Sequence, residues 1–233
     1  DPYGSRFVFF RQVDYKLQLT EISKDGQPVL LEGNGLDFTA WQNGNYAAEM
    51  ADGNKAQASV TDLPAAETVP QGWSVSFQKE RGAPEGQHAF DQLASWTTHS
   101  EEGIKYFSGT ATYTKGINIS QERLKEDQRI YLDLGDVKYV AEVFVNDQPL
   151  GVLWKPPFRV DITDAARPGA NKVAIEITNV WKNRLIKDAQ LPKEQRVTWC
   201  FYPFYHNEPD APLIESGLLG PVQVMSSKTI TLK

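Results

Sequence analysis

GVLWKPPFRVDIT, from Gly151 to Thr163, and the preceding YLDLGDVKYVAEVFVNDQP, from Tyr131 to Pro149, decide the fold of this chain. Together they predict a short strand, a loop, a second strand, an Asn-Asp turn, and a strand that runs into an aromatic-proline corner. Proline fixes its own φ angle and has no N–H to donate to a ladder. We therefore expect Leu153–Phe158 at the edge or the end of a sheet.

Short runs with a two-residue hydrophobic period dominate the rest of the chain and predict an all-β, antiparallel β-sandwich. Tyr46–Met50 and Gln57–Val60 flank Ala51–Asn54, which is a hairpin signal. Only two short helices are expected, at Ser120–Glu126 and Asp164–Arg167. The side chains expected to point into the core alternate with polar or small neighbours: Trp73, Phe107, Leu132, Val143, Ile175 and Ile177.

A stretch rich in proline and alanine, Leu63–Pro70, is interpreted as a linker. It divides the chain into a small β unit, residues 1–69, and a larger domain, residues 70–233. The apolar run Arg6–Arg11 reads as a strand entered in the middle of a domain, so we expect the chain to be part of a longer protein.

Composition excludes several classes of function. The net charge of −6 argues against a nucleic-acid partner, and no apolar run approaches a membrane span. Cys200 alone rules out an internal disulfide framework, and His88, His99 and His206 lack metal-ligand spacing. The carboxylates Glu80, Glu85, Asp91, Glu142 and Asp188 are interpreted as solvated surface acids. We assign no catalytic residue.

Two aromatic regions are candidates for binding carbohydrate. In the first, Trp154 would stack on a sugar ring and Lys155 would donate to a hydroxyl; alternatively, Trp154 and Phe158 plug one end of the sandwich. The second, Trp199–His206, is rich in rings without strand alternation and would either bind carbohydrate or pack against another domain. The candidate carbohydrate-binding residues are Trp154, Lys155, Trp199, Tyr202 and Tyr205.

Several sequence blocks resemble one family in order. They are GWSVSFQKERGAP at Gly72–Pro84, YFSGTATY at Tyr106–Tyr113, the two opening stretches, TNVWKNRLIKDAQLP at Thr178–Pro192, and SGLLGPVQV at Ser216–Val224. This succession, about two-thirds of the chain, resembles the C-terminal β-sandwich of bacterial α-L-rhamnosidases of glycoside hydrolase family 106. More broadly it is similar to the sugar-binding domain of family 2. The opening DPYGSRFVFFR resembles the end of the domain that precedes it.

The resemblance implies a galactose-binding-like jelly roll in a secreted or periplasmic enzyme that removes terminal α-L-rhamnose from plant polysaccharides with inversion. Inversion requires two carboxyl groups about 6.5–9.5 Å apart. In that family both lie on a catalytic barrel, as does the metal, and no position here matches them.

The resulting hypothesis is a non-catalytic carbohydrate-binding or structural part of such a hydrolase. Its partners would be carbohydrate, the catalytic domain of the parent protein, or both. The alternatives are a self-contained glycoside hydrolase fragment and a free-standing adhesion or scaffold module. The sequence identifies no cofactor. Ca²⁺ occurs in some jelly rolls of this type, but its oxygen ligands come from scattered loops and leave no spacing to read.

Overall fold

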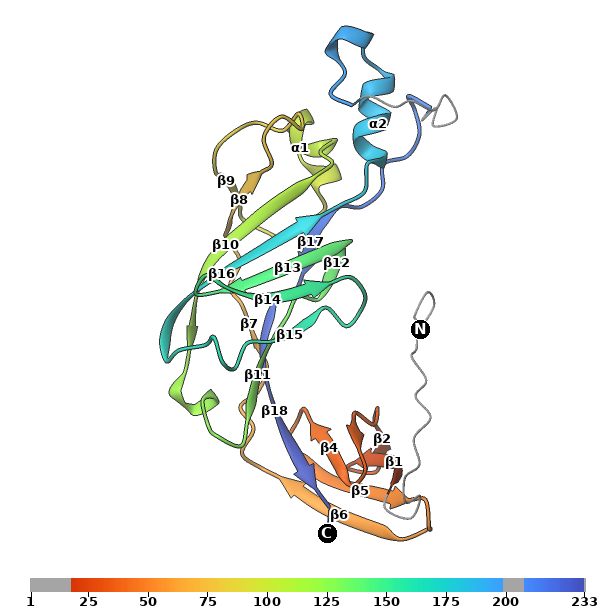
Figure 1. Cartoon of the computed structure of the whole chain (residues 1–233), viewed down its shortest axis with the longest axis vertical. Coiled ribbons are helices and arrows are strands. Elements are labelled where there is room, and N and C mark those ends of the chain that lie inside the picture. Colours follow the sequence, from red (N-terminus) through yellow and green to blue (C-terminus); the bar gives the residue numbers. More distant parts are fainter. Residues whose placement is uncertain (1–17, 199–207, 233) are drawn as a thin grey trace. The chain divides into compact units, whose positions relative to one another are not determined.

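The structure, a computed structural model, describes residues 18–198 and 208–232, and these confirm the predicted all-β, antiparallel fold (Figure 1). The chain forms two compact units. Among the described residues, unit 1 comprises 18–67, 120–131 and 225–232, and unit 2 comprises 68–119, 132–198 and 208–224.

A six-stranded sheet in the order β14-β13-β16-β10-β8-β9 forms the larger layer of unit 2. Its longest strands, β10 (Thr110–Ile119) and β16 (Gly169–Thr178), pair without interruption from Thr110↔Thr178 to Ile119↔Gly169. The remaining strands are β8 (Trp73–Phe77), β9 (His88–Phe90), β13 (Val140–Val145) and β14 (Gln148–Leu153). Asn146 and Asp147 join β13 to β14 with positive φ angles, which confirms the predicted Asn-Asp turn.

Side chains that alternate along these strands form the core of unit 2. Ile175 lies opposite Tyr113 on one side and Val143 on the other, and all three are buried. The six side chains predicted to point inward are all buried: Trp73, Phe107, Leu132, Val143, Ile175 and Ile177. The two-residue period thus identified the buried face of each strand correctly.

Strand β15 (Arg159–Asp161) also belongs to unit 2 and neighbours β11 (Arg129–Asp133), of which Leu132 and Asp133 lie in unit 2. In a separate two-stranded sheet, β12 (Asp136–Lys138) pairs with β17 (Gly217–Gly220). Gly217 has a φ of +106°, and a Cβ there would lie 2.6 Å from Trp96 Nε1. Trp96 Nε1 donates to the buried Tyr113 hydroxyl at 2.5 Å, so glycine is needed where β17 passes over this ring.

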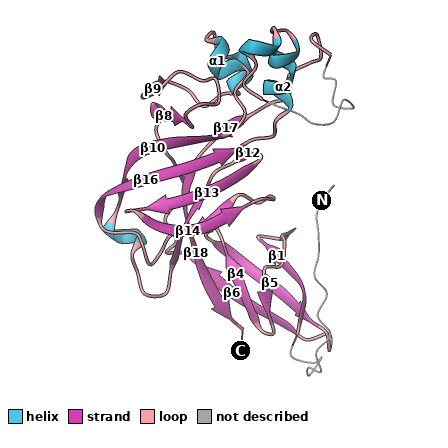
Figure 2. Cartoon of the chain, turned by 45° about the horizontal axis from the view of Figure 1, so that its top comes forward, coloured by secondary structure: helices cyan, strands magenta, loops and turns pink. Residues whose placement is uncertain are grey.

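The helices of unit 2 differ from the predictions. Asp164–Arg167 contains no helix, because the chain turns there before β16 begins. Two α-helices were not predicted, α1 (Glu102–Lys105) and α2 (Lys182–Ala189), and both lie at the same end of the unit (Figures 1 and 2). Two 3₁₀-helices complete it, η2 (Trp96–Thr98) and η4 (Lys193–Gln195).

Unit 1 is a small β-structure with its own core. One sheet has the order β2-β1-β5-β6, from β1 (Leu19–Lys24), β2 (Gln27–Pro28), β5 (Gly44–Met50) and β6 (Lys55–Val60). The hairpin β5–β6 is the one predicted around Ala51–Asn54. In the other, β3 (Gly33–Asn34) pairs with β4 (Asp37–Ala40), and β4 pairs with β18 (Gln223–Thr231) over Lys228–Thr231. The buried residues between them include Phe38, Tyr46 and Leu232.

The segment 120–131 also belongs to unit 1, where the predicted helix Ser120–Glu126 is reduced to the single turn η3 (Gln121–Arg123). The buried Arg123 donates to the carbonyl of Ala65 at 2.6 Å and to Ser226 Oγ at 3.1 Å. Three separated segments are thereby joined within one unit.

The proline-rich stretch Leu63–Pro70 is ordered. Leu63 and Val69 are buried, and β7 (Glu67–Thr68) pairs with β18. The chain passes from unit 1 to unit 2 between Glu67 and Thr68. Because each unit is assembled from separated segments, the division into domains 1–69 and 70–233 stays a prediction.

Candidate carbohydrate-binding surface

The loop Trp154–Pro157 connects β14 to β15 and presents an indole ring to solvent. Trp154 has 59% of its surface exposed, and Val152, on the edge strand β14, has 54% exposed. Lys155 Nζ lies 6.0 Å from the centroid of the Trp154 ring. Trp154 and Lys155, which are adjacent in the sequence, are both exposed and present an aromatic face and an ammonium donor, the groups that recognise a pyranose ring and its hydroxyls.

Neighbouring residues fix this loop to the sandwich. Phe158 is only 7% exposed, and its carbonyl accepts from the N–H of Leu134 at 2.8 Å. Arg159 pairs with Asp133 at 3.1 Å. Two consecutive prolines hold the backbone between this anchor and the indole, so Trp154 is exposed on a restrained loop.

The plug interpretation is therefore half wrong. Phe158 does pack into the end of the sandwich, whereas Trp154 lies outside it. Hydrophobicity alone cannot separate the two rings, because both flank the same prolines. Which of the two rings is buried depends on how the chain is oriented where it enters β15.

The other three candidate residues cannot be placed in this surface. Trp199, Tyr202 and Tyr205 lie outside the described residues. Their role in carbohydrate binding stays a prediction.

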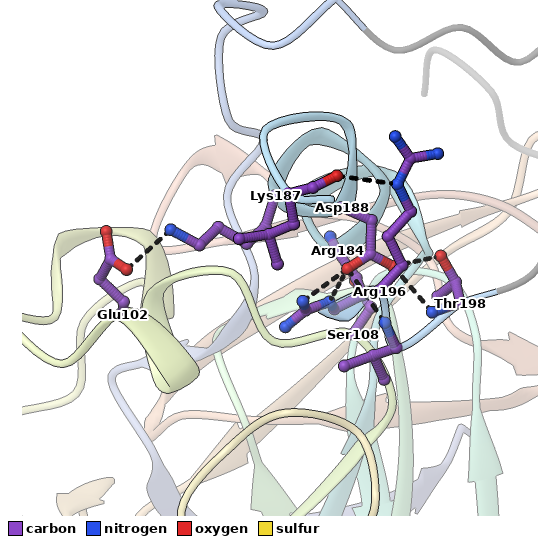
Figure 3. Close-up of polar contacts among 9 residues, drawn as sticks. Glu102, Ser108, Arg184, Lys187, Asp188, Arg196 and Thr198 are labelled. Carbon is purple, nitrogen blue, oxygen red and sulfur yellow. Dashed lines mark hydrogen bonds and ion pairs between the residues drawn. The ribbon is translucent and has the colours of Figure 1, made fainter. Parts of the chain in front are cut away.

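Helix α2, in the segment interpreted from the sequence as part of a long connection, carries a buried ion pair. Arg184 Nε and Nη2 donate to Asp188 Oδ1 at 2.9 and 2.5 Å, and both side chains are almost fully buried (Figure 3). Asp188 also accepts from the backbone N–H of Thr198 at 2.8 Å and from its hydroxyl. The prediction that Asp188 is a solvated surface acid is wrong; it fastens the chain after α2 to the helix.

The charge state of this cluster follows from its contacts. Burial raises the pKa of the Asp188 carboxyl, but hydrogen bonds from Arg184, Thr198 and Val197 outweigh burial and hold that pKa below its ordinary value. Nearer the surface, Lys187 Nζ donates to Glu102 Oε2 at 2.7 Å and lowers the pKa of Glu102 (Figure 3). Asp188 is therefore a charged structural group, and α2 is tied to α1.

A second exposed indole was missed by sequence reasoning. Trp181, directly before α2, is 43% exposed, and the guanidinium carbon of Arg81 lies 4.9 Å from the centroid of its ring. The sequence signal that could have pointed there is a tryptophan within the largely polar stretch TNVWKNR, which lies a hundred positions from Arg81. Only the fold brings the two side chains together.

The described titratable groups show no metal-binding arrangement. Within residues 18–198 and 208–232, no three His, Cys, Asp or Glu side chains gather where they could hold a metal ion. His88 Nδ1 lies 4.0 Å from Glu101 Oε2, and His99 stacks on Phe90 with 5.5 Å between ring centroids. His206 lies outside the described residues.

In the described part of the chain, no helix combines the length and apolar composition needed to cross a bilayer.

Comparison with known proteins supports this architecture. Residues 96–211 match the family described as "Glycosyl hydrolase 2 galactose-binding domain-like". A protein of Formosa agariphila named "Putative beta-glucuronidase" is 35% identical over 95% of this chain and 21% of its own length. The structure of a rhamnosidase from Novosphingobium sp. PP1Y superimposes with a TM-score of 0.69 and 31% identity, over 92% of this chain and 21% of that one.

The chain spans about a fifth of the length of both relatives. The matched region, the antiparallel sheets and the similarity to a solved rhamnosidase agree with one another. This chain therefore contains a galactose-binding-like β-sandwich domain related to that of glycoside hydrolases of family 2.

Proposed function

We propose that this chain is a non-catalytic part of a secreted or periplasmic α-L-rhamnosidase of family 106 that acts on plant polysaccharide. Two observations support this assignment: the similarity to the Novosphingobium rhamnosidase over 92% of the chain, and the ordered series of sequence blocks. The Formosa relative carries a different name, so the sugar specificity of the parent has to be measured.

Within this role, we propose that the Trp154 loop binds carbohydrate. The observation that carries the proposal is the exposure of the Trp154 ring on a loop held by two prolines and the buried Phe158. A large apolar ring that is restrained in solvent loses little conformational freedom when a sugar stacks on it. Lys155 supplies a donor beside the ring.

The site is open and small, so binding should be weak, with a dissociation constant in the roughly millimolar range. The test is a titration of the ¹⁵N-labelled chain with L-rhamnose and neutral plant oligosaccharides, in which the indole N–H signals are followed by NMR. We expect saturable shifts of the Trp154 signal that disappear in Trp154→Ala. Tyr139→Ala, which removes another exposed aromatic ring of the same unit, is the matched control and should leave neutral-sugar binding unchanged.

Saturable shifts that survive Trp154→Ala would place the neutral-sugar site elsewhere. Absence of shifts with every neutral sugar would favour the second candidate role, in which the exposed Trp154 and Val152 contact the catalytic domain of the parent. The chain spans about a fifth of the length of its relatives, and most of each relative lies outside the matched region.

A further inference from the structure

We infer that Arg81 and Trp181 form a second carbohydrate subsite, one that takes a pyranose bearing an oxyanion, either the carboxylate of a uronic acid or a sulfate ester. The inference rests on the proposed carbohydrate-binding role of the chain, but it concerns different residues and a different class of sugar.

The first argument is the pairing of the two groups. The Arg81 guanidinium lies 4.9 Å from the centroid of the Trp181 ring, and 43% of the Trp181 surface remains exposed. A pyranose could therefore stack on the exposed part of the indole while its anionic substituent meets the guanidinium. An arginine presents five N–H donors in a planar fork, which matches the geometry of a carboxylate or a sulfate.

The second argument is that Arg81 has no acidic partner. Among residues 18–198 and 208–232, no carboxylate forms an ion pair with Arg81, and its guanidinium lies over the Trp181 ring. The neighbouring cations differ: Lys79 pairs with Glu85, Arg184 with Asp188, and Lys187 with Glu102. The Arg81 fork is thus not occupied by any described carboxylate.

The third argument is that the backbone next to Arg81 packs closely against α2. The Arg81 side chain itself is half-buried. Gly82, the next residue, has a φ of +86°, and a Cβ there would lie 2.4 Å from Arg184 Nη1. Because glycine lets α2 approach the backbone this closely, the loop that carries Arg81 is fixed before any ligand arrives.

The test uses the whole ¹⁵N-labelled chain and follows the Trp181 indole N–H signal. The probes are trigalacturonate, its fully methyl-esterified form, and a sulfated neutral trisaccharide. We expect saturable shifts with at least one anionic probe, and this binding should weaken when NaCl is added. If the carboxylate is the group recognised, the methyl ester should bind at least tenfold more weakly than trigalacturonate. The anionic probe that binds more tightly identifies the oxyanion.

Arg81→Gln keeps the stem of the side chain and removes its charge, so the shifts should be lost; a dispersed spectrum confirms that this variant folds. Arg81→Lys keeps the charge but loses the fork and should retain only part of the affinity. Lys79→Gln removes a neighbouring cation and is the matched control, expected to stay within about twofold because Lys79 is exposed and already paired with Glu85. Lack of any Trp181 shift, or shifts that Arg81→Gln leaves intact, would overturn the inference.

The two proposals fail separately. Trp154→Ala should abolish binding of neutral sugar and leave the anionic probes bound at Trp181. A chain that binds neutral sugars at Trp154 and no anionic probe would refute the second subsite alone. A chain that binds an anionic probe at Trp181 and no neutral sugar would refute the Trp154 site alone.

Discussion

At the scale of single residues, Ile175 should be sensitive to truncation, because it is buried and has a buried side chain opposite it on each of the two neighbouring strands. Ile175 lies between Tyr113 and Val143 in the central sheet and is fully buried. Ile175→Ala should lower the free energy of unfolding by about 2–5 kcal/mol, from lost burial and the cavity left behind. Chemical denaturation measures this. Lys172→Ala, on the exposed face of the same strand, should change stability by less than about 0.5 kcal/mol. Equal midpoints for Ile175→Ala and the unmodified chain would contradict the register.

Tyr113 should make the protein sensitive to alkaline pH. Burial raises the pKa of its hydroxyl to about 12, although hydrogen bonds from Leu218 and Trp96 act in the opposite direction. The folded state therefore favours neutral Tyr113. Its stabilising effect is full below the unfolded pKa of about 10 and is lost as pH rises toward 12, by roughly 1.4 kcal/mol per pH unit.

Unfolding free energies measured between pH 9 and 12 test this expectation, because the unfolded and folded pKa values of Tyr113 differ by about two units in that range. Tyr113→Phe should show a shallower fall over that interval. At neutral pH the same substitution should destabilise the fold by about 1–3 kcal/mol, because Trp96 Nε1 loses its acceptor. An unchanged alkaline slope would mean that Tyr113 is accessible to water.

At the scale of elements, helix α2 is stabilised by the buried ion pair between Arg184 and Asp188. Asp188→Asn would leave the buried Arg184 without its counter-charge, so we expect a loss of about 3–5 kcal/mol in the free energy of unfolding. Glu102→Gln breaks the ion pair with Lys187 at an exposed site, where solvent screens the charges, so it should destabilise the fold far less than Asp188→Asn. Thermal or urea denaturation of the two variants makes the comparison.

The pH dependence gives a separate check on α2. The pKa of Asp188 is lowered in the folded state, so its contribution is present above the ordinary value of 3.8 and is lost as pH falls below that value. Asp188→Asn should therefore flatten the acid limb of the stability profile. Similar acid limbs in the variant and the unmodified chain would show that Asp188 is not the titrating group.

At the scale of the whole molecule, unit 1 should depend on the last residues of the chain. Lys228–Thr231 pair with β4, and Leu232 belongs to the core around Phe38 and Tyr46. Deletion of residues 225–233 removes this strand and part of that core, so unit 1 should lose its protection against hydrogen exchange. Retained protection of β1 and β5 would show that residues 18–67 are stable without β18.

The chain should not hydrolyse an aryl α-L-rhamnoside. It spans about a fifth of its relatives, and the resemblance assigns the two catalytic carboxyl groups to a barrel that no part of this sequence matches. Incubation of the purified chain with the chromogenic substrate is the assay. Turnover above buffer that vanishes when one of its own carboxylates is replaced would contradict the non-catalytic role.

The sequence by itself determined the strands of the sandwich and which of their faces are buried, because a two-residue period reports burial locally, as Trp73, Val75 and Phe77 show. It also placed the proline corner and the Asn-Asp turn, since both depend on the backbone preferences of one or two residues. Helix α2 could not be predicted from the sequence, because Asp188 and Arg184 have the pattern of solvent-exposed charges and only the fold buries them against each other.

Only the tertiary structure decided the rest. Whether Trp154 or Phe158 faces the core depends on how the corner meets β15, and the pairing of Arg81 with Trp181 joins residues a hundred positions apart. Unit 1 likewise takes segments from three parts of the chain. Local preferences act over a few residues, whereas these contacts arise from packing between elements distant in sequence, and no pattern within a single segment encodes them.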